Sequence, residues 1–224
     1  MDAFGFGPFT LSPGSALRVA GVPSLRWTMS YGLEDVAERS VIYAATQSEV
    51  IEAFAADRAA FVRRARGEHW PAHVSLIDVE SGDEVAHFLA YGSCGMTPGL
   101  IDDRSRYWLR STDRLLSRDV TLTEFARVAH DEAAPSEAWI CGLLPDAVLT
   151  DNPDDWRAPT SWEIRHVVGE GSFTHVSGAK AAKLIGVTPQ NFRKYTARDG
   201  ASTRQPISFA MWHLLLHKLG VKRA

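Results

Sequence analysis

Apolar and polar residues alternate in short runs over the first part of the chain, and this pattern predicts β-strands. Runs rich in aromatic and β-branched residues occur at 4–11, 25–31 and 39–45, and such runs are typical of strands. The predicted strands are broken by turn-forming residues, namely Pro13, Gly14, Pro23 and Gly32.

The apolar spacing changes from Ser48 onward. Residues 51, 54, 55, 61 and 62 are apolar and recur at three- and four-residue spacing, which predicts a helix that Ser48 opens. Two further strands, at 73–80 and 84–91, flank Ser81-Gly82-Asp83, a sequence typical of a hairpin turn.

The middle of the chain carries weaker signals. Residues 92–99 (GSCGMTPG) are predicted to form a linker or an exposed loop. A helix is expected from Thr121 or Thr123 to Asp131, and a shorter one from Ser136 to Leu143. Residues 151–159 (DNPDDWRAP) are acidic and bounded by prolines, which favours a connector to the last part of the chain.

From residue 160 the pattern becomes compact and helical. Thr160 and Glu163 have the T-x-x-E spacing of a capping box, in which a hydroxyl and a carboxylate bond the free amides at a helix start. This helix is expected to end near Gly169. A final helix is expected from Ser208 to Gly220, with Phe209, Trp212, Leu216 and Leu219 toward the core.

Between these two helices, residues 178–195 (GAKAAKLIGVTPQNFRKY) fit a helix-turn-helix. Ala182 is small where two crossing helices approach closely, and Gly186 supplies the left-handed conformation that ends the first helix. Thr188 is a good N-cap, and Pro189 is preorganised for the first position of the second helix.

The second helix of this motif has two distinct faces. At about 100° per residue, Phe192, Tyr195 and Thr196 share one face, which is expected to be buried. The opposite face carries Gln190, Arg193, Lys194 and Ala197, with Asn191 and Arg198 at its flank. Gln, Asn and Arg side chains make bidentate contacts with base edges, whereas Lys180, Lys183 and Lys194 suit phosphates.

The distribution of charge supports a nucleic-acid-binding segment at this end. Residues 1–159 contain 14 Arg, no Lys and 24 acidic residues, a net charge of −10. Residues 160–224 contain 10 basic and three acidic residues, a net charge of +7, and include all five lysines. A basic module on an acidic body is expected of a protein that binds DNA at one end.

The remaining candidates for chemistry are weak, so we predict no enzyme, no cofactor and no metal. His213 and His217 are four residues apart, but no third ligand is apparent. Cys94 and Cys141 lie far apart without a metal-binding spacing, and no nucleotide-binding or nucleophile-elbow motif occurs. Without a signal sequence or a membrane span, a reduced cytoplasmic protein is the simplest interpretation.

Together these patterns predict an α+β protein of three parts: a sheet-and-helix domain over 1–95, a small mixed domain over 96–155, and an all-α helix-turn-helix domain over 156–224. The middle domain is the expected site of dimerisation.

Residues 160–223 resemble the autorepressor domain of a family of dual-function phage proteins. These proteins join a type I-F anti-CRISPR to an anti-CRISPR-associated (Aca-like) helix-turn-helix. The similarity extends in order through GPFTL, RWTMSYG, SEV and AWICGLLPDAVLT.

The resemblance implies a homodimer in the bacterial host cell that binds the crRNA-guided surveillance (Csy) complex and blocks interference. It also implies repression of its own operon through an inverted repeat in the promoter. Thr188, Gln190, Asn191, Arg193 and Lys194 stand at the recognition-helix positions. Two alternatives are a mobile-element repressor without anti-CRISPR activity and an enzyme with a DNA-targeting domain.

Overall fold

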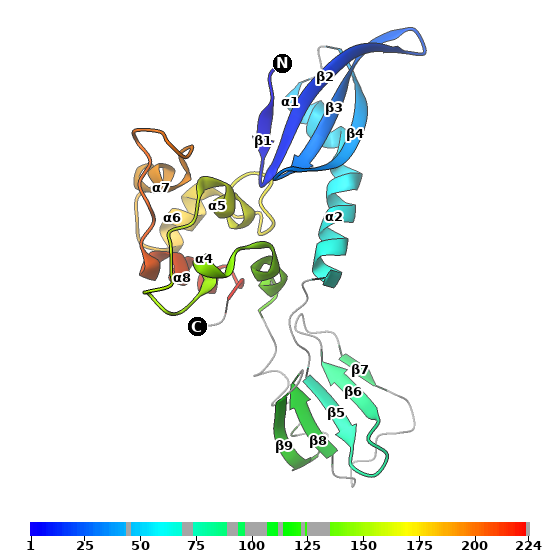
Figure 1. Cartoon of the computed structure of the whole chain (residues 1–224), viewed down its shortest axis with the longest axis vertical. Helices are drawn as coiled ribbons and strands as arrows, with labels where there is room; N and C mark the ends of the chain where they lie inside the picture. Colours follow the sequence, from blue (N-terminus) through cyan, green and yellow to red (C-terminus); the bar gives the residue numbers. More distant parts are fainter. Residues whose placement is uncertain are drawn as a thin grey trace. The chain divides into compact units, whose positions relative to one another are not determined.

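The computed structural model describes residues 1–43, 46–68, 74–88, 94–96, 107–111, 114–121, 124 and 135–222 (Figure 1). The chain is a mixed α+β protein, as predicted. Close packing divides it into two compact units. The first joins residues 1–68 to 144–215, and the second joins 69–143 to 216–224. The three-part division with boundaries after residues 95 and 155 stays a prediction from the sequence.

The first unit begins with a four-stranded antiparallel sheet in the order β1-β2-β3-β4. Its strands are β1 (Phe4–Phe6), β2 (Phe9–Val19), β3 (Val22–Tyr31) and β4 (Glu34–Ile42). Alternate residues of the central strands face the core, among them Leu11, Trp27 and Met29. The expected strand at 4–11 is in fact two strands joined by a tight turn at Gly7, whose φ is +60°.

The prediction that Pro13, Gly14 and Pro23 break strands is wrong, because the first two lie inside β2 and Pro23 lies inside β3. β1 pairs only with residues 9–11, so β2 is an edge strand from Ser12 onward. An edge strand tolerates a proline, which has no N–H to donate, and the register shifts between Pro13 and Ala16 as in a β-bulge. β4 likewise begins at Glu34, five residues earlier than expected.

Two helices, α1 (Gln47–Ala53) and α2 (Ala55–Glu68), follow the sheet. Thr46 rather than Ser48 is the N-cap, since its side chain accepts from the Glu49 amide and the Glu49 carboxylate accepts from the Thr46 amide. Phe54 and Phe61 are buried, and the Phe61 ring lies 5.1 Å from that of Phe9 on β2. The helices therefore cover the apolar face of the sheet.

The rest of the first unit is helical. It contains α4 (Asp146–Leu149), α5 (Ser161–Val167), α6 (Gly178–Leu184), α7 (Pro189–Thr196) and the greater part of α8 (Phe209–Lys218). Trp212 is fully buried and its indole N–H donates to the Val148 carbonyl at 2.8 Å, which ties α8 to α4. Of the residues predicted to face the core, Trp212 and Leu216 are buried, whereas Phe209 and Leu219 are half-buried.

Within this unit the sheet packs directly on α5 and the loop after it. The Trp162 indole N–H donates to the Pro8 carbonyl at 2.9 Å, and the Gly7 amide donates to the Glu170 carbonyl at 2.8 Å. Gly171 has a φ of +77°, and a Cβ there would lie 2.6 Å from the Gly7 nitrogen. Side chains are thus excluded from both backbones at this contact.

The second unit contains a five-stranded antiparallel sheet in the order β7-β6-β5-β8-β9. Its strands are β5 (Val74–Asp78), β6 (Glu84–Phe88), β7 (Cys94–Met96), β8 (Tyr107–Ser111) and β9 (Arg114–Val120). The β5–β6 hairpin was predicted, and Gly82 in its turn has a φ of +77°. Residues 94–96 pair with β6, so they are not the expected linker or exposed loop, and β8 and β9 had no counterpart in the prediction.

The second unit also contains a short helical segment among its described residues. Ala138–Leu143 form a 3₁₀ helix, η1, in place of the helix expected at 136–143. The helix expected from 121 or 123 to 131 lies outside the described residues, apart from Thr121 and Glu124, which bond each other as in a capping box. Gly220, with a φ of +68°, follows the end of α8 as expected.

Candidate nucleic-acid interface

Three local capping interactions fix the start and the end of α6 and the start of α7. Ser177 caps α6, its hydroxyl accepting from the Lys180 amide at 3.3 Å. At the other end Gly186 has a φ of +73°; its amide bonds the Lys183 carbonyl, and the next amide bonds that of Ala182 at 2.9 Å. This is the paired hydrogen-bond pattern of a glycine C-cap. Thr188 then caps α7, with Pro189 at its first position, as predicted.

Small residues let α6 approach α7 closely. Ala181 and Ala182 are fully buried, as is Phe192 of α7. A Cβ on Gly178 would lie 3.7 Å from the Phe192 ring. Tyr195 and Thr196 are half-buried, so the predicted inward face of α7 is centred on Phe192.

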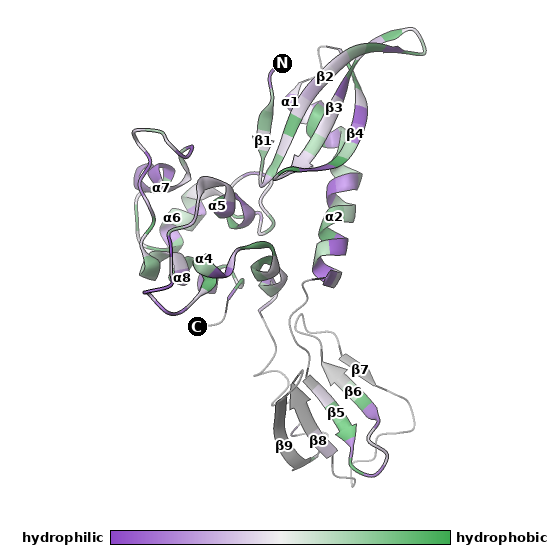
Figure 2. Ribbon diagram, viewed as in Figure 1, coloured by the Kyte–Doolittle hydropathy of each residue, from purple (hydrophilic) through white to green (hydrophobic). Residues whose placement is uncertain are grey.

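The opposite side of this helix pair is polar, and Figure 2 shows α7 as predominantly hydrophilic. Of the predicted site residues, all but one are exposed: Lys180, Lys183, Thr188, Gln190, Asn191, Arg193 and Arg198. Lys194 is half-buried, and its carbonyl accepts from the Gln205 amide at 3.1 Å. The structure thus leaves two lysines of α6 and the polar residues at the start of α7 exposed.

Two predicted positions on α7 need correction. Ala197, expected on the exposed face, is half-buried and ends the helix with a ψ of 149°. Arg198 therefore lies beyond α7 in the following loop, where its direction no longer follows the helical spacing. Thr188 has its hydroxyl oxygen engaged by the Asn191 amide at 3.2 Å.

The acidic residues near the helix pair are held in ion pairs. Glu163 of α5 is buried and accepts two hydrogen bonds from Arg157, at 2.8 and 2.5 Å. Burial acts to raise the pKa of Glu163, but the hydrogen bonds from Arg157 and Thr160 prevail and lower it. This carboxylate is therefore ionised and neutralised in place.

Asp199, just after α7, has a similar role that the sequence did not reveal. Its carboxylate accepts from the Ser161 amide at 3.1 Å, the Ser161 hydroxyl at 2.8 Å and Arg204 Nε at 3.2 Å. Arg204 also donates to the Pro159 carbonyl at 2.8 Å. These contacts fix the loop after α7 to the start of α5 and so hold α7 in place.

The lysines and arginines of α6 and α7 differ from these residues in having no such neutralisation. Lys180, Lys183, Arg193 and Lys194 form no ion pair with any other residue that the structure describes. Glu163 and Asp199 are paired with arginines, whereas these four basic residues of α6 and α7 are not. This surface is suited to an anionic, hydrogen-bonding partner.

The other candidates for chemistry stay separate from this surface. Within the described part of the chain, no three His, Cys, Asp or Glu side chains are placed to hold a metal ion. His213 lies 3.7 Å from Asp151, and His217 is exposed. Burial raises the pKa of the Cys141 thiol to about 11, and its sulfur donates to the Val221 carbonyl. The side chain of Cys94 lies outside the described residues. Among those residues no helix is long and apolar enough to cross a bilayer.

The arrangement is therefore a rigidly capped helix pair with an unneutralised basic and amide-bearing surface, held to an antiparallel sheet by α5. No family model matches the chain, and no curated protein is significantly similar to it.

Proposed function

We propose that the chain binds double-stranded DNA, with α6 and α7 acting as a helix-turn-helix and α7 lying in the major groove. The observation that carries this proposal is that Gln190, Asn191 and Arg193 are exposed on a helix whose start and opposite face are fixed. A recognition helix uses residues near its N-terminus to reach base edges. The three residues lie in the first five positions of α7.

We propose that some of these residues contact base edges and others contact phosphates. Arg193 and the amides of Gln190 and Asn191 suit direct contacts with guanine and adenine edges. Lys180 and Lys183 of α6, Lys194 of α7 and Arg198 after it suit phosphates, which position a protein without reading sequence. Thr188 primarily caps the helix, and its exposed hydroxyl is placed for a phosphate at the same end.

We further propose that the active form is a homodimer that represses its own operon. A two-fold dimer reads an inverted repeat, with half-sites about 34 Å apart when both recognition helices enter one face of the DNA. We also propose that the mixed middle segment, over residues 96–155, dimerises and that residues 156–224 form an all-α DNA-binding domain.

DNA binding is tested with the full chain by selecting bound sequences from a pool of random duplexes and measuring affinity over a range of salt. Arg193→Ala is expected to weaken the selected site by about 1–3 kcal/mol and to relax base preference. The double change of Lys180 and Lys183 to Ala should instead weaken all duplexes alike. It should also reduce the salt slope by roughly two, since each phosphate contact contributes about 0.9.

The matched control is Arg63→Ala, which removes an exposed arginine from α2, far along the chain from α6 and α7. It should leave affinity, specificity and the salt slope unchanged. If the Arg193 variant selects the same sequences with the same affinity as the wild type, α7 is not the recognition helix.

A second proposed activity is inhibition of a type I-F CRISPR system through the crRNA-guided surveillance complex. It is supported by the resemblance of the quoted stretches, and the net charge of −10 over residues 1–159 is compatible with binding a basic nucleic-acid channel. Because the first unit joins residues from both ends of the chain, the test uses the full chain carrying Arg193→Ala and Lys194→Ala. If it suppresses interference without binding DNA, the two activities are separate. Intact interference with no retention on the purified complex would leave a repressor without anti-CRISPR activity.

A further inference from the structure

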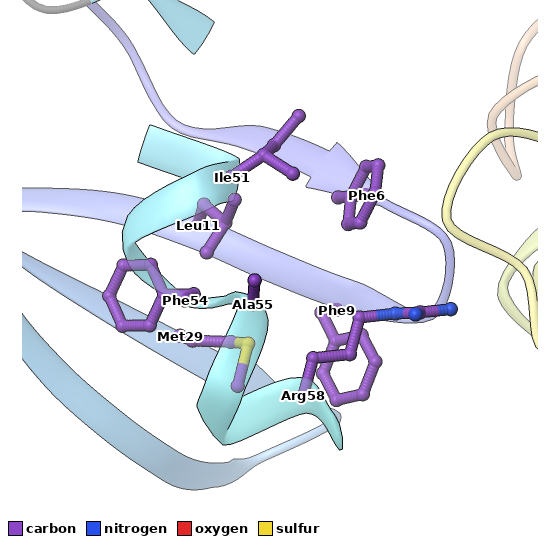
Figure 3. Close-up of a pocket in the computed structure, with 8 residues that line it drawn as sticks. All are labelled: Phe6, Phe9, Leu11, Met29, Ile51, Phe54, Ala55 and Arg58. Carbon is purple, nitrogen blue, oxygen red and sulfur yellow. The ribbon is translucent and has the colours of Figure 1, made fainter. Parts of the chain in front are cut away.

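A cavity of about 160 Å³ lies between the four-stranded sheet and the helices α1 and α2 (Figure 3). Its lining is almost wholly apolar and comes from five elements and from Phe54 between the helices. Figure 3 shows Phe6 and Phe9 of the strands across from Phe54 and Met29, with the side chain of Arg58 extending past Phe9. Arg58 is the one charged residue in the lining.

Arg58 has hydrogen-bond partners that leave its charge uncompensated. One terminal nitrogen, Nη2, donates to the carbonyls of Gly171 and Ser172, both at 3.1 Å. The guanidinium also lies 5.7 Å from the centre of the Phe6 ring. All of these partners are neutral, and Arg58 forms no ion pair within the described part of the chain. The adjacent acid, Asp57, is paired with Arg39 instead.

The same guanidinium has a donor that is already buried and has no partner. The Nε atom is inaccessible to solvent and makes no hydrogen bond to a described residue. Leaving a buried charged donor unsatisfied is costly, on the order of 1–3 kcal/mol or more. Burial correspondingly lowers the pKa of Arg58 from its ordinary value. An anion at this side of the cavity would supply the missing countercharge to the guanidinium.

We propose that this cavity is a binding site for a small aromatic or branched aliphatic monocarboxylate, with its apolar group among the phenylalanines and its carboxylate on Arg58. The size fits, since an apolar cavity of roughly 150 Å³ binds benzene. The chemistry fits as well, because a carboxylate accepts short, charge-assisted hydrogen bonds from a guanidinium. The site lies between the sheet and the helices α1 and α2, and no residue of α6 or α7 lines it.

The proposal is tested by titration calorimetry of the full chain with benzoate, phenylacetate and isovalerate, and with benzyl alcohol as a neutral ligand of similar shape. At least one carboxylate is expected to bind about tenfold more tightly than the alcohol, the effect of one charge-assisted hydrogen bond. Arg58→Gln should abolish that preference. Arg63→Gln, the same change at an exposed position of α2, should preserve it.

Because Arg58 also bonds the loop at residues 171–172, a second variant tests the cavity without touching the guanidinium. Ala55→Phe adds a ring at the lining and should remove binding of every ligand while the circular dichroism spectrum stays that of the wild type. The proposal is overturned if no carboxylate binds. It is equally overturned if the alcohol binds as tightly as the carboxylates, or if binding is unchanged by Arg58→Gln or by Ala55→Phe.

Discussion

His166 lies at the junction between α5 and the sheet, and its burial makes stability depend on pH in a predictable way. The ring is fully buried, with Tyr31, Trp162 and Phe173 around it. Nδ1 lies 3.0 Å from the Trp162 carbonyl and therefore donates to it, so Nε2 accepts from the Tyr31 hydroxyl at 2.7 Å. Burial lowers the pKa of His166 from 6.5 to about 4, although the Trp162 carbonyl and the nearby Glu163 carboxylate act in the opposite direction.

The size of the effect follows from the two pKa values. Between pH 6.5 and about 4 the unfolded chain binds a proton that the folded chain excludes. The stability that the neutral ring contributes is fully present above pH 6.5 and is lost progressively as the pH falls. Below about pH 4 both the folded and the unfolded chain carry the proton, so stability no longer changes through this group. A full pKa unit corresponds to about 1.4 kcal/mol, so the free energy of unfolding should fall by about 3 kcal/mol across this window.

Urea denaturation followed by tryptophan fluorescence between about pH 7 and pH 4 measures this slope. Over this range the free energy of unfolding of His166→Gln should fall by about 3 kcal/mol less than that of the wild type. The carboxylates contribute equally to both proteins, so they do not affect this difference. His217→Gln, at an exposed position of α8, serves as the control and should follow the wild type.

If His166→Gln keeps the wild-type dependence of stability on pH, the buried ring is not its source. A second readout covers the possibility that this variant does not fold. In the wild-type protein, nuclear magnetic resonance should show that the His166 ring stays neutral at pH 5.5. A His166 resonance that titrates near its ordinary pKa of 6.5 would contradict the burial described here.

Two further matched pairs test the local devices of the helix pair. In thermal denaturation, Gly186→Ala should destabilise the chain by about 1–2 kcal/mol. The cause is the left-handed backbone alone, since open space surrounds the Cβ position. Gly67→Ala within α2 should instead stabilise the chain by about 0.5–1 kcal/mol. A gain of stability in Gly186→Ala, or the same loss in both variants, would refute this assignment of strain. Ala182→Leu should lower the free energy of unfolding by about 1–3 kcal/mol and reduce DNA binding, because Ala182 is fully buried. Ala179→Leu, at an exposed position of α6, should change neither. Equal effects of the two variants in urea denaturation would show that the close approach of α6 to α7 is not needed.

The features that were predicted correctly depend on residues a few positions apart. Thr160 and Glu163 cap α5 within one turn, and Gly186, Thr188 and Pro189 form the turn before α7, so their spacing alone reveals them. The β5–β6 hairpin is another local case, because Gly82 stands in the turn itself.

The features that were missed depend on partners distant in sequence. Whether Pro13 breaks a strand depends on how far β1 extends beside β2, which local composition does not encode. The Asp199 contacts with Ser161 span 38 residues, and the Tyr31–His166 bond spans 135. For the same reason Arg58 gave no signal in the sequence, since its partners at residues 171 and 172 lie more than a hundred positions away.

The contact between Gly7 and Gly171 has a consequence for how such a chain can evolve. Residues 160–224 differ so much in charge from residues 1–159 that they resemble a domain that recombination could exchange between proteins. Yet the Gly7 amide bonds the carbonyl of Glu170, and the two glycine backbones leave no room for a side chain on either. Recombination that replaced residues 160–224 alone would be viable only where the incoming loop again placed a glycine against residue 7. The helical segment and the first ten residues of the chain are therefore expected to be inherited together.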